Sequence, residues 1–336
     1  MQARRWTAED IPDQRGRVVV ITGGNRGLGL ATAKALAAKN ATVVLASRDV
    51  RRAERARQEI LAAVPSASVT VMELDLASLA AVRRFAEQFR EAFPRLDILI
   101  NNAGVMGWPR TETADGFEAH FGINHLGHFA LTGLLLGRLL DTPKSRVVTV
   151  SSQMEAAANL RFDDLMGERR YNPMIAYSRS KLCNLLFAYE LERRLRRIGS
   201  ETISVAAHPG TAATAILDSL RAPGASLAMR LLAWAADVFA QPPEMAALPQ
   251  LFAATAPHVR GGEYYGPGGF FNMRGYPRRA RSSRRSYDEG MARKLWNVSA
   301  ALTGVRFERL ETPPPSGGGI PAGEEQPESG PGSANG

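Results

Sequence analysis

Short runs of apolar and β-branched residues alternate along the chain with longer segments whose apolar residues recur at helical spacing. The short runs predict strands at 18–22, 42–46, 69–73, 97–101, 147–151 and 203–207, and a seventh near 263–265. The longer segments predict helices at 28–39, 51–64, 79–93, 117–140 and 175–198. Continuous apolar strands such as 18–21 indicate a sheet that helices cover on both faces. This alternation predicts an α/β fold, a doubly wound parallel sheet of about seven strands.

Composition divides the 336 residues into three parts. Residues 311–336 are rich in Pro, Gly, Ser and Glu with one large apolar residue, Ile320, so we expect a disordered tail. Residues 1–15 mix charges and lack the apolar stretch of a signal peptide, so we interpret them as an N-terminal arm. Residues 16–310 remain as a single Rossmann-type domain. No stretch reaches the roughly 20 apolar residues of a membrane-spanning helix, and we expect a soluble, cytoplasmic protein.

The chain carries 42 Lys and Arg against 33 Asp and Glu, a formal net charge of +9. Six of the arginines fall in residues 274–285, which we interpret as a solvated, flexible loop, with nucleic acid or anionic lipid contact as the alternative. Because this segment accounts for most of the surplus, we expect no nucleic-acid partner.

Cysteine and histidine usage argues against a metal site or a disulfide framework. The single cysteine, Cys183, excludes an internal disulfide and any Cys-based zinc site, and its place in an expected helix favours packing. His125, His128 and His208 have no carboxylate or Cys in the sequence pattern to complete a ligand set. We therefore expect these histidines to have polar or packing roles, and no metal.

The first expected strand leads directly into a glycine-rich turn with the spacing T-G-x-x-x-G-x-G. Gly23 permits a tight turn, Gly27 lets the backbone approach a pyrophosphate, and Gly29 lets the next helix pack closely on the sheet. The helix N-terminus offers free N–H groups and a positive dipole end to phosphates. The turn therefore predicts dinucleotide binding. The expected contacts here are Gly23, Asn25, Arg26, Gly27, Leu28 and Gly29.

The end of the second expected strand indicates which dinucleotide is bound. An NAD-selective site places Asp or Glu there to accept hydrogen bonds from the ribose 2′-hydroxyl, but this chain has Ser47-Arg48. Serine leaves room for a 2′-phosphate, and the guanidinium groups of Arg48 and Arg26 can bind it. NADP(H) is therefore the preferred cofactor; NAD(H), with Asp49 on the ribose hydroxyls, is the alternative. Further contacts are expected after strand three, at Asp75 and Leu76.

A candidate reactive pair lies at the start of the last long helical segment. Tyr177 and Lys181 are four residues apart, so they project from one helix face. A phenol with a pKa of about 10 is a poor proton carrier at neutral pH, but a nearby ammonium and a cofactor's positive charge favour the phenolate. The motif occurs together with residues 101–104 (Asn-Asn-Ala-Gly) after strand four and Ser151-Ser152 after strand five, so coincidence is a poor explanation.

This set of motifs resembles the short-chain dehydrogenase/reductase family, over residues 15–310, and within it the retinol dehydrogenase-like branch. A lengthened segment also matches that branch and separates Ser152 from Tyr177 by 25 residues. The shared segments are Asn124-His125-Leu126-Gly127-His128-Phe129, His208-Pro209-Gly210-Thr211, Leu295-Trp296-Asn297-Val298-Ser299 and Arg161-Phe162-Asp163-Asp164-Leu165.

The resemblance implies a role for each catalytic position. Tyr177 would be the general acid in reduction or the base in oxidation, and Lys181 would lower its pKa and hold the nicotinamide ribose. Ser152 would hydrogen-bond the substrate oxygen, and Asn124 would hold a water in a proton relay through Lys181. The resemblance also implies cofactor contacts at Asn102, Ala103, Gly104, Tyr177, Lys181, Pro209, Gly210 and Thr214.

The family implies that the apolar segment at 216–243 is a lid over a lipophilic substrate. A helix packed on the core, at an oligomer interface or on a membrane surface is the alternative. We expect an NAD(P)-dependent oxidoreductase that interconverts a lipophilic aldehyde or ketone and its alcohol, reductively with NADPH. A non-enzymatic NADP(H)-sensing module that binds a partner through its arginine-rich loop is the alternative function. Homo-oligomers are common in the family, and the sequence selects no oligomeric state.

Overall fold

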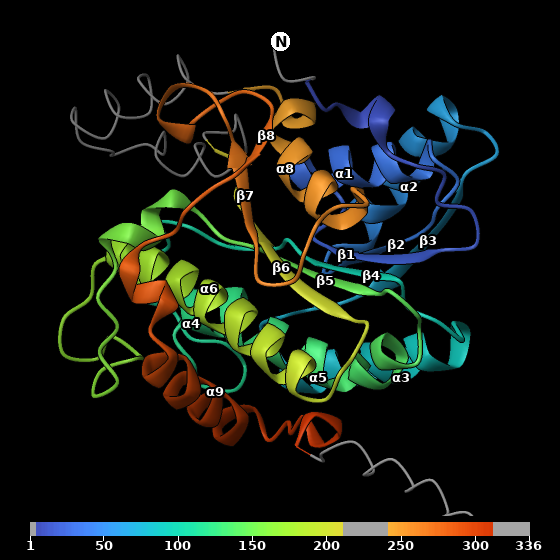
Figure 1. Cartoon of the computed structure of the whole chain (residues 1–336). Helices are drawn as coiled ribbons and strands as arrows, with labels where there is room; N and C mark the ends of the chain where they lie inside the picture. Colours follow the sequence, from blue (N-terminus) through green and yellow to red (C-terminus); the bar gives the residue numbers. More distant parts are fainter. Residues whose placement is uncertain (1–4, 211–240, 312–336) are drawn as a thin grey trace, which may run out of the picture.

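The computed structural model describes residues 5–210 and 241–311, in which eight strands form one sheet (Figure 1). The strand order is β3-β2-β1-β4-β5-β6-β7-β8; β1 to β7 run parallel, and β8 is antiparallel to β7. The strands are β1 (Val18–Thr22), β2 (Thr42–Ser47), β3 (Ser68–Glu73), β4 (Ile98–Asn101), β5 (Arg146–Val150), β6 (Ile203–Ala207), β7 (Tyr264–Pro267) and β8 (Pro277–Arg279). The order reverses between β1 and β4, and this confirms the predicted doubly wound sheet.

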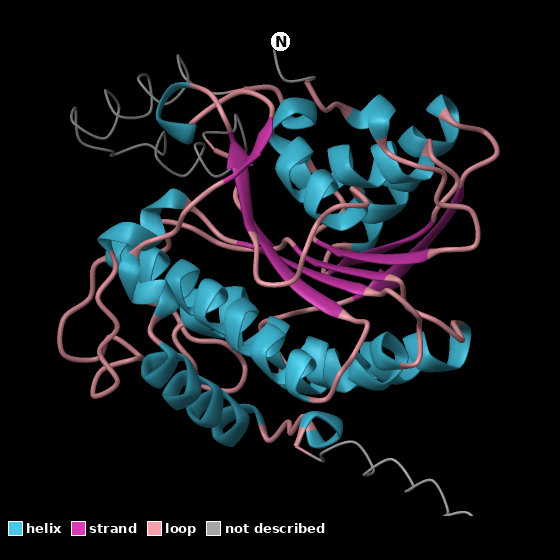
Figure 2. Ribbon diagram, viewed as in Figure 1, coloured by secondary structure: helices cyan, strands magenta, loops and turns pink. Residues whose placement is uncertain are grey.

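Helices cover both faces of the sheet (Figure 2). One layer contains α1 (Gly27–Ala37), α2 (Val50–Ala63) and α8 (Pro243–Thr255), and the other contains α3 (Leu79–Ala92), α5 (Gly127–Leu140) and α6 (Pro173–Arg197). Outside the second layer, α9 (Glu289–Thr303) packs on α6. Alternate residues of β1 enter the two cores: Val19 joins the α1 side and Val20 the α5 side. Burial on both faces explains why the strand is apolar throughout.

The helix expected at 117–140 is interrupted. It consists of the short α4 (Ala119–Phe121), one π-helical turn, η2 (Gly122–Leu126), and then α5. Periodicity could not predict the π turn, because it adds a residue without ending the apolar pattern. Such turns often lie at functional sites, and this one holds Asn124.

The six arginines of the arginine-rich segment are exposed, as expected of a solvated segment, but the segment contains regular structure and is not simply a loop. Residues 277–279 form β8, and residues 284–287 form a short 3-10 helix. Ser283 donates to both carboxylate oxygens of Glu155, through its backbone N–H at 2.8 Å and its hydroxyl at 2.7 Å. Arg285 donates to the carbonyl of Ala158 at 3.1 Å. The segment is therefore fastened to the loop that follows β5.

The predicted termini and lid are described only in part. Trp6 packs edge-on against Phe252 of α8, with ring centroids 5.2 Å apart, and Ile11 is buried, so the N-terminal arm from residue 5 lies on the domain. Residues 216–240 of the expected lid, and the expected tail after Glu311, lie outside the described residues. The remaining short helices are η1 (Ala8–Asp10), η3 (Gln153–Ala157), η5 (Phe270–Asn272), η6 (Arg284–Tyr287) and η7 (Glu308–Leu310).

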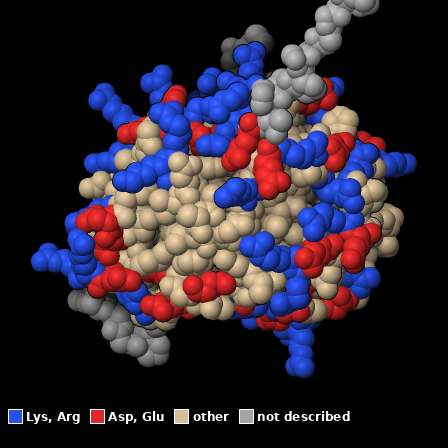
Figure 3. All heavy atoms as spheres, turned by 90° about the horizontal axis from the view of Figure 1, so that it is seen from below, with Lys and Arg blue, Asp and Glu red and all other residues tan. Residues whose placement is uncertain are grey.

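The surface charge is relevant to a nucleic-acid partner, and the hydropathy of the helices is relevant to a membrane. On the face seen in Figure 3, Lys and Arg side chains are interspersed with Asp and Glu around a broad area that carries neither, so this face has no continuous basic stripe. Over the described ranges, no helix combines the length and apolar character needed to cross a bilayer.

Candidate active site

The structure brings the predicted catalytic residues together at the carboxyl ends of the central strands. Ser152 lies two residues after the end of β5 and caps η3, while Tyr177 and Lys181 lie on adjacent turns of α6. The Tyr177 phenol is hydrogen-bonded to Ser152, and Nζ of Lys181 lies 5.7 Å from the centre of the tyrosine ring. Tyr177 and Lys181 are both buried, at 7% and 4% exposure. Water therefore competes little for their hydrogen bonds.

Burial dominates the acid–base behaviour of Tyr177. It raises the pKa of the phenol above its ordinary value, and the hydrogen bond with Ser152 lowers the pKa by less. From the sequence we expected Lys181 to lower this pKa. In the protein without a cofactor, burial outweighs any such effect and the pKa of Tyr177 is raised. The phenol is therefore protonated at neutral pH in the protein alone.

Lys181 is held with its ammonium group inside the protein. Nζ donates to the carbonyl oxygen of Val150 at 3.1 Å, and Asn184 Nδ2 donates to the same oxygen at 3.1 Å. The hydroxyl of Ser151 donates to the main-chain carbonyl of Lys181 at 2.8 Å, and this hydrogen bond holds the backbone of Lys181 in place. Burial lowers the pKa of Lys181 to about 8, because a charged ammonium is poorly solvated there.

Asn124 connects the loop after β4 to α6. Its Oδ1 accepts from the N–H of Val105 at 2.8 Å, and its Nδ2 donates to the carbonyl of Val105 at 3.0 Å and to the hydroxyl of Ser180 at 2.9 Å. Its main-chain carbonyl accepts from Nδ1 of His128 at 3.0 Å. The side chain therefore positions the loop, and the expected role in holding a relay water stays a prediction.

Thr22, which the sequence analysis did not single out, connects three segments of the site. Its hydroxyl oxygen accepts the N–H groups of Asn102 and Ala103, each at 2.9 Å, and lies 2.9 Å from Nε2 of His128. Because Nδ1 of His128 donates to Asn124, Nε2 is the acceptor for the threonine hydroxyl. Burial lowers the pKa of His128 to about 4 and keeps it neutral. The final residue of β1 thus fixes the expected nicotinamide loop.

The glycine-rich turn has the backbone that its sequence predicts. Gly23 and Gly27 have positive φ values of 66° and 50°. A Cβ on Gly29 would lie 2.3 Å from the carbonyl oxygen of Gly23, so only glycine fits there. Side chains cap α2, α3, α6 and α9, but Arg26 at the start of α1 provides no such hydrogen bond. The first N–H groups of α1 are left for a ligand such as a pyrophosphate.

The residues expected around the adenosine ribose lie beside this turn. Ser47 is buried at the end of β2, whereas Arg48 and Arg26 are exposed. Asp49, the alternative ribose ligand, caps α2 by accepting from the N–H of Arg52 at 2.9 Å. Asp75 accepts from the N–H of Ala77 at 2.9 Å.

All but one of the residues expected to contact the nicotinamide lie within the part of the chain that the structure describes. Gly104 lies against the catalytic residues, since a Cβ there would be 3.1 Å from Oδ1 of Asn124 and 3.4 Å from Nζ of Lys181. Gly210 has a φ of 69°, and its N–H donates to Nδ1 of His208 at 3.2 Å. Pro209 accepts from Nε2 of Gln241 at 2.9 Å. Thr214 lies outside the described residues.

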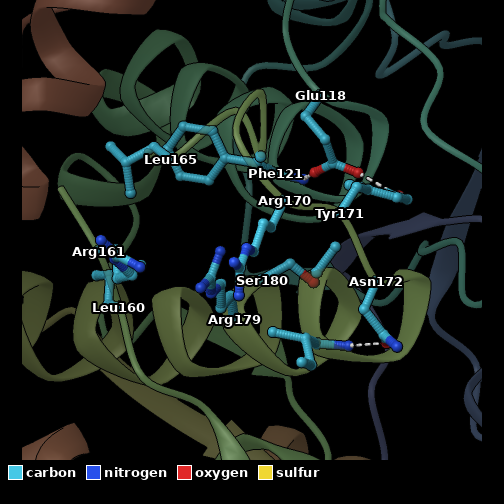
Figure 4. A pocket seen from close by; sticks show the side chains of 13 residues that line it. Glu118, Phe121, Leu160, Arg161, Leu165, Arg170, Tyr171, Asn172, Arg179 and Ser180 are labelled. Atoms are coloured by element: carbon cyan, nitrogen blue, oxygen red, sulfur yellow. Dashed lines mark hydrogen bonds between the residues drawn. The ribbon is translucent and has the colours of Figure 1, made fainter. Parts of the chain in front are cut away.

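A buried network next to Tyr177 was not predicted from the sequence. The carboxylate of Glu118 accepts from the backbone N–H groups of His120 and Phe121, from His120 Nδ1 at 2.7 Å and from the Tyr171 hydroxyl at 3.0 Å (Figure 4). Burial alone would raise the pKa of Glu118, but these hydrogen bonds outweigh it and lower the pKa. The His120 ring lies edge-on to Tyr177, with centroids 6.4 Å apart. An E-x-H pattern at positions 118–120, at the start of the expected helix, was the available signal.

His125, His208 and Cys183 are buried side chains, in line with the packing or polar roles expected for them. Nε2 of His125 lies 2.8 Å from the Ser299 hydroxyl, and burial lowers the pKa of His125 to about 3 and that of His208 to about 4. Cys183 is buried in α6, where burial raises its thiol pKa. Across the described residues no group of three metal-ligating side chains occurs.

The fold and the Ser152–Tyr177–Lys181 cluster define an oxidoreductase of the short-chain type. A model of the short chain dehydrogenase family matches residues 17–224, and the chain belongs to this family. Members of the family use nicotinamide cofactors.

Within the family the chain is retinol dehydrogenase-like. It is 41% identical to retinol dehydrogenase 14 of Mus musculus, over 86% of each protein, and 41% identical to retinol dehydrogenase 11 of Homo sapiens, over 87% of each. A solved structure of an uncharacterised protein from Mycobacterium paratuberculosis matches 90% of this chain and 99% of its own, with 42% identity and a TM-score of 0.74.

Proposed function

We propose that this short-chain oxidoreductase reduces a lipophilic aldehyde or ketone to its alcohol with NADPH. The observation that carries the proposal is the meeting of the buried Tyr177 and Lys181 with the half-buried Ser152 at the strand ends, next to the uncapped start of α1. A bound nicotinamide would supply the hydride, and the protein must bind it and polarise one C–O bond.

The free N–H groups at the start of α1 would bind the pyrophosphate, and Gly104 would leave room for the nicotinamide ribose beside Lys181. NADP(H) is favoured because Arg48 and Arg26 are exposed near the end of β2 and form no ion pair among the described residues. Asp49, which an NAD-selective site would use on the ribose, already caps α2. These arginines can hold a 2′-phosphate by charge-assisted hydrogen bonds.

The catalytic cluster can stabilise a developing alkoxide. Ser152 and Tyr177 donate hydrogen bonds to the substrate oxygen, and Tyr177 then transfers its proton to it. The raised pKa of Tyr177 keeps the phenol protonated, as a proton donor in reduction must be. Lys181, with a pKa of about 8, is charged at neutral pH and stabilises the phenolate that remains.

The substrate class follows from the relatives and from the sequence. The curated relatives are named for retinol, a lipophilic alcohol, and the predicted lid at 216–243 is strongly apolar. The arginine-rich segment, on which the alternative sensing function depended, is fastened to the loop after β5. Location in the cytoplasm remains a prediction.

The test is a screen of lipophilic aldehydes and ketones with both cofactors, reporting kcat/KM for each pair. We expect NADPH-dependent reduction of several long or branched aldehydes and slower reaction with NADH. A strong preference for NADH would contradict the roles given to Arg48 and Arg26. No turnover of any carbonyl or alcohol with either cofactor would favour the sensing function.

A further inference from the structure

A cavity lies against the first turns of α6. It has a volume of about 390 Å³ and lies between the start of α6, the α4 region and residues 160–172 (Figure 4). Tyr177, Lys181 and Ser152 do not line it. Of the α6 residues that line it, Ile175 and Arg179 lie on a different helix face from Tyr177, whereas Ser180, three residues after Tyr177, borders the catalytic face. Its size is within the range of small-molecule sites.

The wall of this cavity is amphipathic. Apolar side chains form much of it, and Ile175 remains 49% exposed despite its size. Arg170 and Arg179 project into the space in Figure 4, and Arg161 lies at its edge. The apolar lining residues are Phe121, Leu160, Leu165, Ile175 and Ala176. An apolar surface with guanidinium groups over it matches a ligand that has an apolar body and an anionic end.

The lining of the cavity carries more positive than negative charge. Glu118 is the one acidic side chain of the lining, and its oxygens are already occupied by His120, Phe121 and Tyr171. Arg179 donates through Nε to the carbonyl of Asn159 at 3.0 Å, which leaves its other N–H groups available. For Arg170 the described residues supply no carboxylate partner.

Arg161 differs from the other two arginines. It pairs with Asp163 at 3.4 Å, and Arg169, which does not line the cavity, pairs with the same carboxylate at 3.0 Å. Arg170 and Arg179 are therefore two like charges in one concavity without an acidic partner. Such an arrangement favours the binding of an anion.

We propose that this cavity binds a small amphipathic anion. The carboxylate or phosphate group of the ligand pairs with Arg170 and Arg179, and its apolar body lies against Ile175 and Leu165. The cavity also adjoins the catalytic helix, because Ser180 lines it and donates to the carbonyl of Tyr177 at 2.7 Å. The proposal concerns binding only and does not depend on the reductase activity.

Calorimetric titration of the full-length protein with decanoate tests the proposal, with acetate as the same charge without an apolar body. We expect saturable decanoate binding that weakens at least about tenfold in the Arg170→Gln/Arg179→Gln double variant and is little changed in Arg169→Gln. Acetate should bind at least about tenfold more weakly than decanoate. Ala176→Leu, which fills the cavity, should weaken decanoate binding and leave both arginines in place.

Several results would overturn the proposal. Decanoate binding that is unchanged in the double arginine variant and in Ala176→Leu would place the ligand elsewhere, for example in the catalytic cleft. Equal affinity for acetate would remove the need for an apolar body. Arginine-dependent binding to phosphatidylserine vesicles, without saturable decanoate binding, would make this face a membrane contact. Carbonyl reduction measured in parallel reports on the proposed function separately, because decanoate binding is measured without turnover.

Discussion

Replacing Lys181 by methionine should make the protein more stable while abolishing its activity. The ammonium group is buried and has no counter-ion among the described residues; it donates a hydrogen bond to the carbonyl of Val150. Methionine has a similar length and no charge, so it can occupy the same space. Catalysis would be lost because Tyr177 would have no ammonium beside it.

The size of the stabilisation follows from the pKa of Lys181. Burial lowers it from 10.5 to about 8, and each pKa unit is worth about 1.4 kcal/mol, so keeping this lysine charged costs about 3 kcal/mol at neutral pH. Losing the hydrogen bond to Val150 offsets about 1 kcal/mol, since Asn184 still donates to that carbonyl. We expect a net gain of about 2 kcal/mol, or a rise in Tm of roughly 5 °C.

The pH dependence distinguishes this explanation from better packing. Between pH 8 and 10.5 the unfolded chain still holds the proton that the folded protein has released, so the stability of the native protein rises with pH. The advantage of Lys181→Met should therefore be full below pH 8 and shrink as the pH rises towards 10.5. Lys34→Met, which removes an exposed lysine paired with Glu59, is the control and should change Tm little. A lower Tm for Lys181→Met, or a gain independent of pH, would refute the reasoning.

Three further substitutions test the site. Gly29→Ala should destabilise the protein by about 1–3 kcal/mol and abolish cofactor binding by fluorescence titration, because its Cβ would meet the carbonyl of Gly23; Gly137→Ala, whose Cβ would make only an ordinary contact with the Arg309 side chain, should not. Glu118→Gln should cost about 1.5–3 kcal/mol in thermal unfolding at pH 7. Because the folded-state pKa of Glu118 is lowered, that cost should shrink as the pH falls below 4.5, and a constant cost would contradict an ionised carboxylate. Arg48→Gln should weaken NADPH binding about 10- to 100-fold and leave NADH binding unchanged; equal losses would argue against a 2′-phosphate contact.

Local sequence patterns were sufficient to predict strands β1 to β7 and the proximity of the candidate catalytic residues. Continuous apolar runs identify strands that are buried on both faces, and the Tyr177–Lys181 spacing depends only on helix geometry. The glycine-rich turn is equally local, since Gly29 is required by a contact with Gly23 only six residues away.

The contacts that the sequence did not reveal join residues far apart in the chain. Tyr171 meets Glu118 across 53 positions, and Thr22 meets His128 across 106, so no periodicity relates them. The strand β8 was not predicted, because it is short and rich in arginine and therefore lacks the apolar pattern of a strand. Its conformation is determined by pairing with β7 at the edge of the sheet.

The central claim is that Tyr177 is the proton donor in an NADPH-dependent carbonyl reduction. The most direct measurement is NADPH oxidation by Tyr177→Phe, with the aldehyde that the wild-type protein reduces fastest, alongside NADPH titration of both proteins. Phenylalanine keeps the ring against His120 and removes only the hydroxyl. We predict that kcat falls by about 10²- to 10⁴-fold while NADPH affinity stays within about twofold. Near wild-type turnover in this variant would contradict the assignment.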